Sequence, residues 1–135
     1  MQVSLVPVHL VDNLWPHVSE GFQRASKRFG GDITVGELWT ACRSGHVFFF
    51  VVQNDTGEIV GATIFRSEAW GKGQRFRCLA MYGIGIKLWR DVALEHVVKV
   101  AKLAGCNGIV SDGREGIGKL FPEAKKVRSV FEMEI

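Results

Sequence analysis

Residues 88–106, LWRDVALEHVVKVAKLAGC, carry the pattern that decides the fold. Small and aliphatic side chains recur there at helical spacing, which predicts an amphipathic helix over residues 88–104. Gly105 follows as the expected C-terminal cap of that helix. Because residues 108–111 then have the pattern of a short strand, we expect the helix to cross over between two parallel strands of one sheet.

The residues before this helix have the composition of β-strands. Residues 47–52 (VFFFVV) are aromatic and β-branched, and the run is too short for a helix, so they predict a strand buried on both faces. Turn residues 54–57 (NDTG) follow, and residues 59–65 resume the strand as a hairpin. A polar loop is expected over residues 66–74, before another strand over residues 76–82.

Two further helices are expected nearer the start of the chain. An edge strand over residues 3–8 comes first, where Pro7 is tolerated. A helix then begins after Asp12 as N-cap and ends before Gly30 and Gly31. Thr34 and Glu37 form a capping-box pattern, which predicts a short second helix that stops at Gly45.

The end of the chain predicts a helical turn over residues 116–121, ended by Pro122, and a last strand over residues 127–135 with one solvent-facing side. Residues 1–135 are therefore expected to form a single α/β domain. Its sheet is mixed and mostly antiparallel, with flanking helices.

Composition agrees with one globular domain. The chain has 135 residues, of which 47% are hydrophobic and 23% are charged, which excludes disordered, collagen-like and disulfide-scaffold classes. A formal net charge of +3 is too close to balance to indicate nucleic acid or an anionic membrane by itself.

Cysteine and histidine spacing gives no metal-site pattern. Cys42, Cys78 and Cys106 lie far apart, and the four histidines lie on different expected elements, so we expect free, packed thiols and no metal. The N-terminus lacks a signal-peptide pattern, and no apolar run is long enough to span a bilayer. We therefore expect a soluble, cytoplasmic protein.

The order of the expected elements, with residues 101–106 (AKLAGC) closing the long helix before a strand, resembles that of the GNAT superfamily of N-acetyltransferases. The resemblance covers essentially the whole chain and rests on element order. It implies acetyl-CoA as the cofactor and a small amine as the acceptor. Short, motif-poor chains of this kind also resemble proteins encoded beside virion genes in tailed phages, which implies a head, tail or assembly role as an alternative.

The resemblance also implies a pyrophosphate loop of the form R/Q-x-x-G-x-G/A, and its candidate here is Gly83-Ile84-Gly85. The cofactor-binding residues would then be Met81, Gly83, Ile84, Gly85 and Ile86. Ala80 stands where the family has Arg or Gln. Counted back from Gly105, the loop position instead falls on residues 88–91, where bulky side chains and a carboxylate would block a pyrophosphate. The alternative is that both glycines only let the chain turn into the helix.

A second family element, the acid that reprotonates the departing thiolate, is a Tyr in an N-x-x-A-x-x-x-Y pattern. Laid on this chain, the pattern falls on Arg114, Ile117 and Phe121. Phenylalanine cannot donate a proton, so Tyr82, the chain's only tyrosine, is the remaining candidate acid, with a core or interface ring as the alternative. Glu68 or Glu58 could act as general base, directly or through a water, or could simply be a solvated carboxylate.

Residues 66–77 (RSEAWGKGQRFR) combine basic side chains with an aromatic ring. The expected partner-binding residues are Arg66, Trp70, Lys72, Arg75 and Arg77, and this mixture suits either phosphates and bases or a protein partner. A mobile solvated loop is the alternative. Three functions stay open: an active acetyltransferase, a catalytically inactive interaction or virion protein with the same fold, and a weak nucleic-acid binder.

Overall fold

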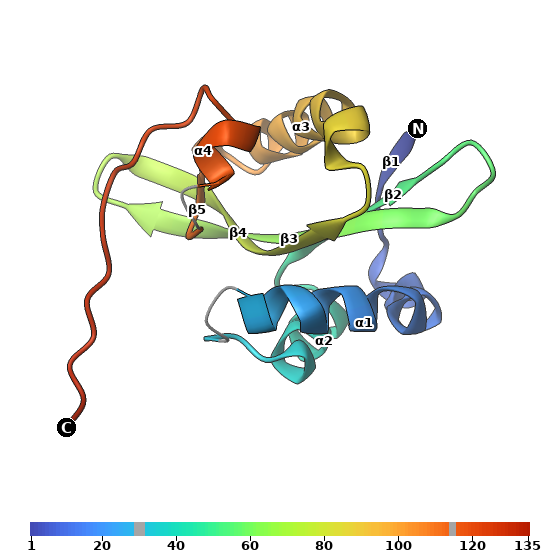
Figure 1. Cartoon of the computed structure of the whole chain (residues 1–135), viewed down its shortest axis with the longest axis horizontal. Helices are drawn as coiled ribbons and strands as arrows, with labels where there is room; N and C mark the ends of the chain where they lie inside the picture. The colour runs from blue at the N-terminus through green and yellow to red at the C-terminus, as the bar shows by residue number, and fades with distance from the viewer. Residues whose placement is uncertain (29–31, 114–115) are drawn as a thin grey trace.

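A computed structural model describes residues 1–28, 32–113 and 116–135 and places one five-stranded sheet between two layers of helices (Figure 1). The strands follow chain order across the sheet: β1 (Gln2–Leu5), β2 (Phe48–Gln53), β3 (Ile59–Trp70), β4 (Gly73–Gly83) and β5 (Cys106–Ser111). The first four pair antiparallel, and β5 pairs with β4 in parallel.

Helices cover both faces of this sheet. The 3-10 turn η1 (Val8–Leu10) leads into α1 (Val11–Arg28), which lies with α2 (Val35–Ser44) on one face (Figure 1). The opposite face carries α3 (Ile86–Leu103), which crosses over from β4 to β5, and the short α4 (Gly116–Leu120). The predicted mixed, mostly antiparallel sheet with flanking helices is therefore confirmed, and so is the parallel crossover.

The interior strand β2 supplies side chains to both cores. Phe49 packs beside Phe22 of α1, with ring centroids 6.3 Å apart. Its neighbour Phe50 points to the other face and packs against Phe65, with centroids 6.0 Å apart. Because consecutive strand residues face opposite sides, a strand covered by helices on both sides has no polar alternation. The prediction of a strand buried on both faces is confirmed.

The helix caps are confirmed for α2 and corrected for α1. Thr34 Oγ1 accepts a hydrogen bond from Glu37 N at 3.1 Å, and Gly45 ends α2 at φ 77°. Helix α1 begins at Val11, so Asp12 lies in its first turn and is not the N-cap. The Asp12 carboxylate instead accepts a hydrogen bond from Trp39 Nε1 at 3.0 Å, which joins α1 to α2. The predicted stop at residues 30–31 lies outside the described residues.

The polar loop predicted over residues 66–74 is wrong. Strands β3 and β4 continue through this region, pair as far as Trp70 opposite Gly73, and reverse over residues 71–72. Figure 1 shows this end of the hairpin extending past α1 and α2. The side chains on the face of α1 and α2 are polar at this end, because neither helix covers them. A strand with one exposed face of this kind resembles a loop in sequence.

The remaining elements agree with prediction only in part. Strand β1 stops at Leu5, so Pro7 lies beyond it and precedes η1, although β1 is an edge strand as expected. Helix α3 begins at Ile86, and Gly105 follows it at φ 82° as predicted. Residues 127–135 form no strand within the described part of the chain, because their backbone pairs with none of the five strands.

All three cysteines are free, and Cys42 and Cys106 are buried, as predicted. Cys78 is half-buried and lies on β4. Burial raises the pKa of the Cys42 thiol to about 12. These thiols pack as small apolar groups.

The contact between Gly21 of α1 and the Tyr82 ring predicts an unusual response to alanine. In a helix interior, Gly→Ala ordinarily stabilises by about 0.5–1 kcal/mol. A Cβ at Gly21 would lie 2.4 Å from Tyr82 Cε2, so we expect Gly21→Ala to lower the free energy of unfolding, by about 1–3 kcal/mol as for overpacked cores. Urea denaturation would measure the change.

The matched control is Gly36→Ala in α2, where the nearest atom to a new Cβ is Thr34 Oγ1 at 3.9 Å. This variant should gain stability. Equal stabilisation of both variants would contradict the close packing of α1 on Tyr82.

Candidate functional site

The sheet opens between β4 and β5. Their pairing ends where Cys78 lies opposite Ser111. At the same point the pairing of β4 with β3 shifts register, so that Leu79 is an extra residue between Cys78 and Ala80. A bulge of this kind bends its strand. Residues 79–83 therefore keep β3 as neighbour on one side and, among the described strands, have none on the other.

A cavity of about 250 Å³ lies at this opening. Residues 78–81 of β4 form part of its lining, together with charged side chains from five segments. These are Asp32 before α2, Arg66 and Glu68 of β3, Arg77 of β4, Asp112 just after β5, and Arg128 of the C-terminal segment. The cavity is thus bounded by groups of both charge signs around exposed strand backbone. Sequence reasoning did not place Asp112 or Arg128 at this site, because it read Asp112 as part of a turn and Arg128 as part of a solvent-facing basic cluster, and their contacts come from distant segments.

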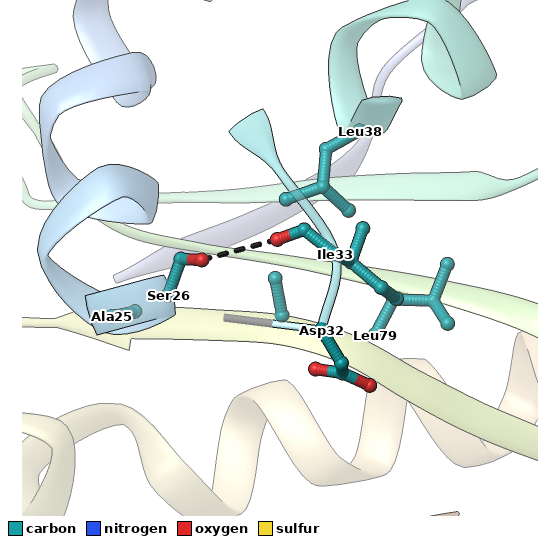
Figure 2. Close-up of a pocket in the computed structure, with 7 residues that line it drawn as sticks. Ala25, Ser26, Asp32, Ile33, Leu38 and Leu79 are labelled. Carbon is teal, nitrogen blue, oxygen red and sulfur yellow. Dashed lines mark hydrogen bonds between the residues drawn. The ribbon is translucent and has the colours of Figure 1, made fainter. Parts of the chain in front are cut away.

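A smaller cavity of about 40 Å³ adjoins the first and is largely apolar. Figure 2 shows Ala25, Leu38 and Leu79 around it, with the Asp32 carboxylate directed away from Leu38. Ser26 Oγ donates a hydrogen bond to Ile33 O at 3.0 Å, which ties the end of α1 to the segment before α2. Because Leu79 and Ala80 line both cavities, a polar and an apolar space meet at the bulge.

Arg77 is the centre of the charged wall. Its side chain is only 7% exposed, and its Nε donates to Glu68 Oε2 at 2.7 Å while Nη1 donates to Asp112 Oδ2 at 3.2 Å. Burying a guanidinium is costly unless carboxylates compensate it, so this triad is required by the burial itself. The expectation that Arg77 belongs to an exposed basic loop is therefore corrected, since it is a buried, paired residue of β4.

Glu68 accepts from Arg77 and also from Trp70 Nε1 at 3.0 Å. The Trp70 hydrogen bond, followed by Arg77 and Arg66, lowers the pKa of this carboxyl, although burial opposes the shift. Glu68 is consequently ionised at neutral pH and a weaker proton acceptor than an ordinary glutamate. It lines the polar cavity, so its predicted base role remains a prediction, while the geometry assigns it to holding Arg77 and Trp70.

The remaining residues predicted for partner binding surround Trp70. Guanidinium groups of Arg75 and Arg128 lie 5.4 and 4.8 Å from the centroid of the Trp70 ring. Trp70 is therefore half-buried between charged side chains, and its ring is covered rather than freely exposed. Lys72 lies exposed in the turn, where its carbonyl accepts from Asn107 Nδ2 at 3.1 Å.

The candidate cofactor loop leads from β4 into α3. Gly85 is the N-cap at φ 63°, without a side-chain hydrogen bond, and the first turn of α3 contains no acidic residue. A Cβ at Gly83 would lie 2.3 Å from Trp89 Cζ2, so the structure explains this glycine by the ring beneath it. Trp89 is buried, and its Nε1 donates to Ile84 O at 3.0 Å. The outer side of the loop is open, with Ile84 and Leu88 both strongly exposed.

The candidate acids lie elsewhere. Tyr82 packs edge-on against Phe22, with centroids 5.1 Å apart, and its Oη makes a long hydrogen bond of 3.5 Å to His17 O. Burial raises the pKa of Tyr82, which lines neither of the two cavities described above. The structure thus gives Tyr82 a packing position on α1, and its acid role remains a prediction.

The predicted acid position, Phe121, directly follows α4. The guanidinium of Arg90 lies 5.2 Å from the centroid of its ring, and Arg90 Nε donates to Leu120 O at 2.7 Å. Arg90 also forms an ion pair with Glu123, so it fastens the end of α4 to α3. Arg114, at the first position of that pattern, lies outside the described residues.

Solved acetyltransferase structures resemble this chain over its whole length. A protein crystallised as a probable acetyltransferase has 12% identity and a TM-score of 0.74, covering 100% of this chain and 98% of its own. A ribosomal-protein-alanine N-acetyltransferase from Brucella melitensis biovar Abortus has 12% identity and a TM-score of 0.70, with 100% of both chains covered. A GNAT family acetyltransferase from Staphylococcus aureus has 12% identity, a TM-score of 0.64 and coverage of 99% and 98%.

This chain has the GNAT acetyltransferase fold. The expectation from element order is thereby confirmed for the fold. No family model and no curated protein matches the sequence. At 12% identity the likeness shows the fold alone.

Two further findings concern the described residues only. None of their helices is long and apolar enough to cross a membrane. No three of their His, Cys, Asp or Glu side chains gather in an arrangement that could hold a metal ion.

The lowered pKa of Glu68 predicts a pH-dependent contribution to stability. A carboxyl whose pKa is depressed in the folded state stabilises that state above its unfolded pKa, and the contribution is lost as the pH falls through the folded value. We expect Glu68→Gln to lower the free energy of unfolding at neutral pH, because Arg77 then keeps only Asp112 as a charged partner.

The difference in the free energy of unfolding between wild type and Glu68→Gln should be smaller at a pH about one unit below the ordinary glutamate pKa of about 4.3 than at neutral pH. Urea denaturation at both pH values would measure it, with Glu58→Gln in the exposed hairpin turn as the matched control. A pH-independent difference would show that the ionised carboxylate is not what stabilises this wall.

Proposed function

We propose that this chain is an acetyl-CoA-dependent N-acetyltransferase whose reaction takes place at the β4–β5 opening. The observation that carries the proposal is the bulge at Leu79, which ends the pairing of β4 with β5 and leaves strand backbone facing a cavity. The whole-length similarity to acetyltransferase structures supports it as an analogy of fold.

The residues at the opening fit the two polar parts of coenzyme A. Unpaired backbone groups in residues 79–83 can hydrogen-bond an extended amide chain such as the pantetheine arm, in the manner of strand addition. The start of α3 has uncapped amides, no acidic side chain in its first turn, and Lys87 nearby, and all three features favour a diphosphate.

In this proposal, Met81 borders the arm and Gly83, Ile84, Gly85 and Ile86 surround the diphosphate. Bound acetyl-CoA supplies the acetyl thioester. Gly83 is already explained by Trp89, so Gly85 is the glycine whose absent side chain leaves room for a ligand.

The polar cavity is the proposed acceptor site. The carboxylates of Glu68 and Asp112 attract an ammonium group, and the guanidinium of Arg77 fixes both carboxylates in place. Attack requires a neutral amine, and the lowered pKa of Glu68 makes proton uptake at that carboxylate costly. The acceptor's proton would therefore pass to water, and water would return a proton to the departing thiolate of coenzyme A. We therefore assign Glu68 to positioning, and the adjoining apolar cavity to the acceptor's hydrocarbon part.

A second candidate function is an inactive GNAT-fold interaction protein. It is supported by Phe121, which cannot donate a proton, and by the packing of Gly83 on Trp89, which explains a motif glycine without any ligand. A phage virion role is one form of this alternative and rests on the sequence resemblance. Nucleic-acid binding has less support, because Arg77 is paired and the Trp70 ring is covered.

Calorimetric titration with acetyl-CoA tests the main proposal. We expect binding in the micromolar range that Gly85→Glu weakens by at least about tenfold, because a carboxylate at the start of α3 repels the diphosphate. The matched control is Gly57→Glu, which introduces the same charge at another positive-φ glycine, in the hairpin turn. Wild-type protein that binds no acetyl-CoA would overturn the proposal and favour the inactive alternative.

Tyr82→Phe tests the remaining acid candidate. Its hydroxyl makes one long bond to a carbonyl of α1, so we expect the variant to keep kcat within about twofold of wild type in an acetyl-transfer assay. A loss of about a hundredfold or more would instead assign general-acid catalysis to this phenol. Circular dichroism would show that the variant is folded.

A further inference from the structure

The polar cavity at the β4–β5 opening holds equal numbers of cationic and anionic side chains. They are Asp32, Arg66, Glu68, Arg77, Asp112 and Arg128. Arg77 is paired with Glu68 and Asp112, and the Arg66 guanidinium lies 3.8 Å from Glu68. Asp32 and Arg128 take part in none of these pairs. Because a charge that lines a cavity is best compensated by an opposite one, the lining favours a ligand that carries both signs of charge.

Arg128 is held at the cavity without using its hydrogen-bond donors on a carboxylate of these pairs. Its guanidinium lies 4.8 Å from the centroid of the Trp70 ring. That ring is fixed in turn, because Trp70 Nε1 donates to Glu68 Oε2 at 3.0 Å. A cation over a ring face keeps the N–H groups at the edge of its plane free. Arg128 can therefore present a pair of parallel donors to a carboxylate in the cavity.

The indole of Trp70 also sets the distance between opposite charges. The Glu68 carboxylate lies at the Nε1 edge of this ring, and the Arg128 guanidinium lies over its face. Anion and cation are thus separated by little more than the indole itself. In an α-amino acid, the ammonium and carboxylate groups are joined through a single carbon, which matches this short separation. A cavity of about 250 Å³ is small for a ligand site and suits a molecule of this size.

The adjoining apolar cavity provides room for a short side chain. Leu79 and Ala80 line both spaces, and Figure 2 shows Ala25, Leu38 and Leu79 around the apolar one. Its volume is about 40 Å³. A water-sized group needs about 10–15 Å³ on this measure, so the space takes about three methyl-sized groups. A short aliphatic chain therefore fits there, whereas an aromatic ring is too large.

We infer that the acceptor is an α-amino acid with a short aliphatic side chain, whose carboxylate is bound by Arg128 while the acidic side chains of the cavity attract its ammonium group. Its role as acceptor rests on the proposed function, whereas its binding does not. On transfer, the nitrogen bonds to the acetyl carbon as the bond from that carbon to sulfur breaks. The ammonium group's two departing protons pass through water, one to solvent and one to the thiolate.

Binding of L-valine tests the inference without acetyl-CoA. The indole N–H of Trp70, assigned among the four tryptophans with Trp70→Phe, would report binding by nuclear magnetic resonance. We expect L-valine to shift this resonance and to bind at least about tenfold more tightly than L-valinamide, because the amide lacks the charge that Arg128 recognises. Isobutylamine, which has the same carbon skeleton without the carboxylate, should bind as weakly as the amide.

Replacing Arg128 separates carboxylate recognition from the rest of the site. We expect Arg128→Gln to weaken L-valine binding at least about tenfold and to change L-valinamide binding less than about twofold. Arg128→Lys, which keeps the charge, should retain a preference for L-valine. The matched control is Arg43→Gln on α2, because the Arg43 guanidinium also lies 4.8 Å from a tryptophan centroid, that of Trp39. This control should leave both affinities unchanged.

Failure of this inference can be told apart from failure of the proposed function. No binding of L-valine, equal binding of L-valine and L-valinamide, or wild-type affinity for L-valine in Arg128→Gln would each overturn the inference. A chain that shows the expected preference but binds no acetyl-CoA would support the amino-acid site and overturn the acetyltransferase proposal. Where both ligands bind, kcat/KM for acetyl transfer should favour L-valine over isobutylamine at least about tenfold.

Discussion

The bulge at Leu79 is the constraint on which the site depends. Up to Cys78, β4 hydrogen-bonds strands on both sides, and one extra residue then bends it away from β5. The separated strands expose backbone N–H and C=O groups that would be hydrogen-bonded to each other in a continuous sheet. Both cavities meet at this residue, and α3 begins only after β4 has continued past it. A single local irregularity thus converts a packed sheet into an opening lined by main-chain donors and acceptors.

Arg77 links the strands on both sides of β4 immediately before the opening. Its guanidinium joins Glu68 of β3 to Asp112 just after β5, across β4 itself. Three strands are therefore held together immediately before the point where two of them separate. The buried member is Arg77, while Asp112 is 65% exposed. A buried guanidinium contributes little net stability compared with apolar packing, but it fixes geometry because displacement of its carboxylates leaves a buried charge without a partner. The charged wall and the opening are consequently parts of one arrangement.

Sequence patterns predicted the parts of the fold that local physics decides. The helical spacing before Gly105, the run over residues 47–52 and the Thr34 cap each depend on neighbours in the chain. The hairpin beyond Phe65 was missed because Arg66 and Glu68 are polar for lack of a covering helix, which no local signal reports. The bulge and the Arg77 triad were missed because both arise from contacts between segments that lie far apart in the chain, which local patterns do not report.

The glycine pair shows why a motif and a function must be separated. Gly83 has a complete steric explanation in the Trp89 ring, and any sequence that packs an indole there requires glycine whether or not a ligand binds. Gly85 has a backbone explanation in its positive φ, but its outer side remains open at the start of an uncapped helix. Packing therefore accounts for the fold and for one glycine, while a ligand site depends on the exposed amides beside the other. Among the described residues, those amides and the β4–β5 opening combine polar backbone groups that lack a strand partner with a neighbouring open surface or cavity.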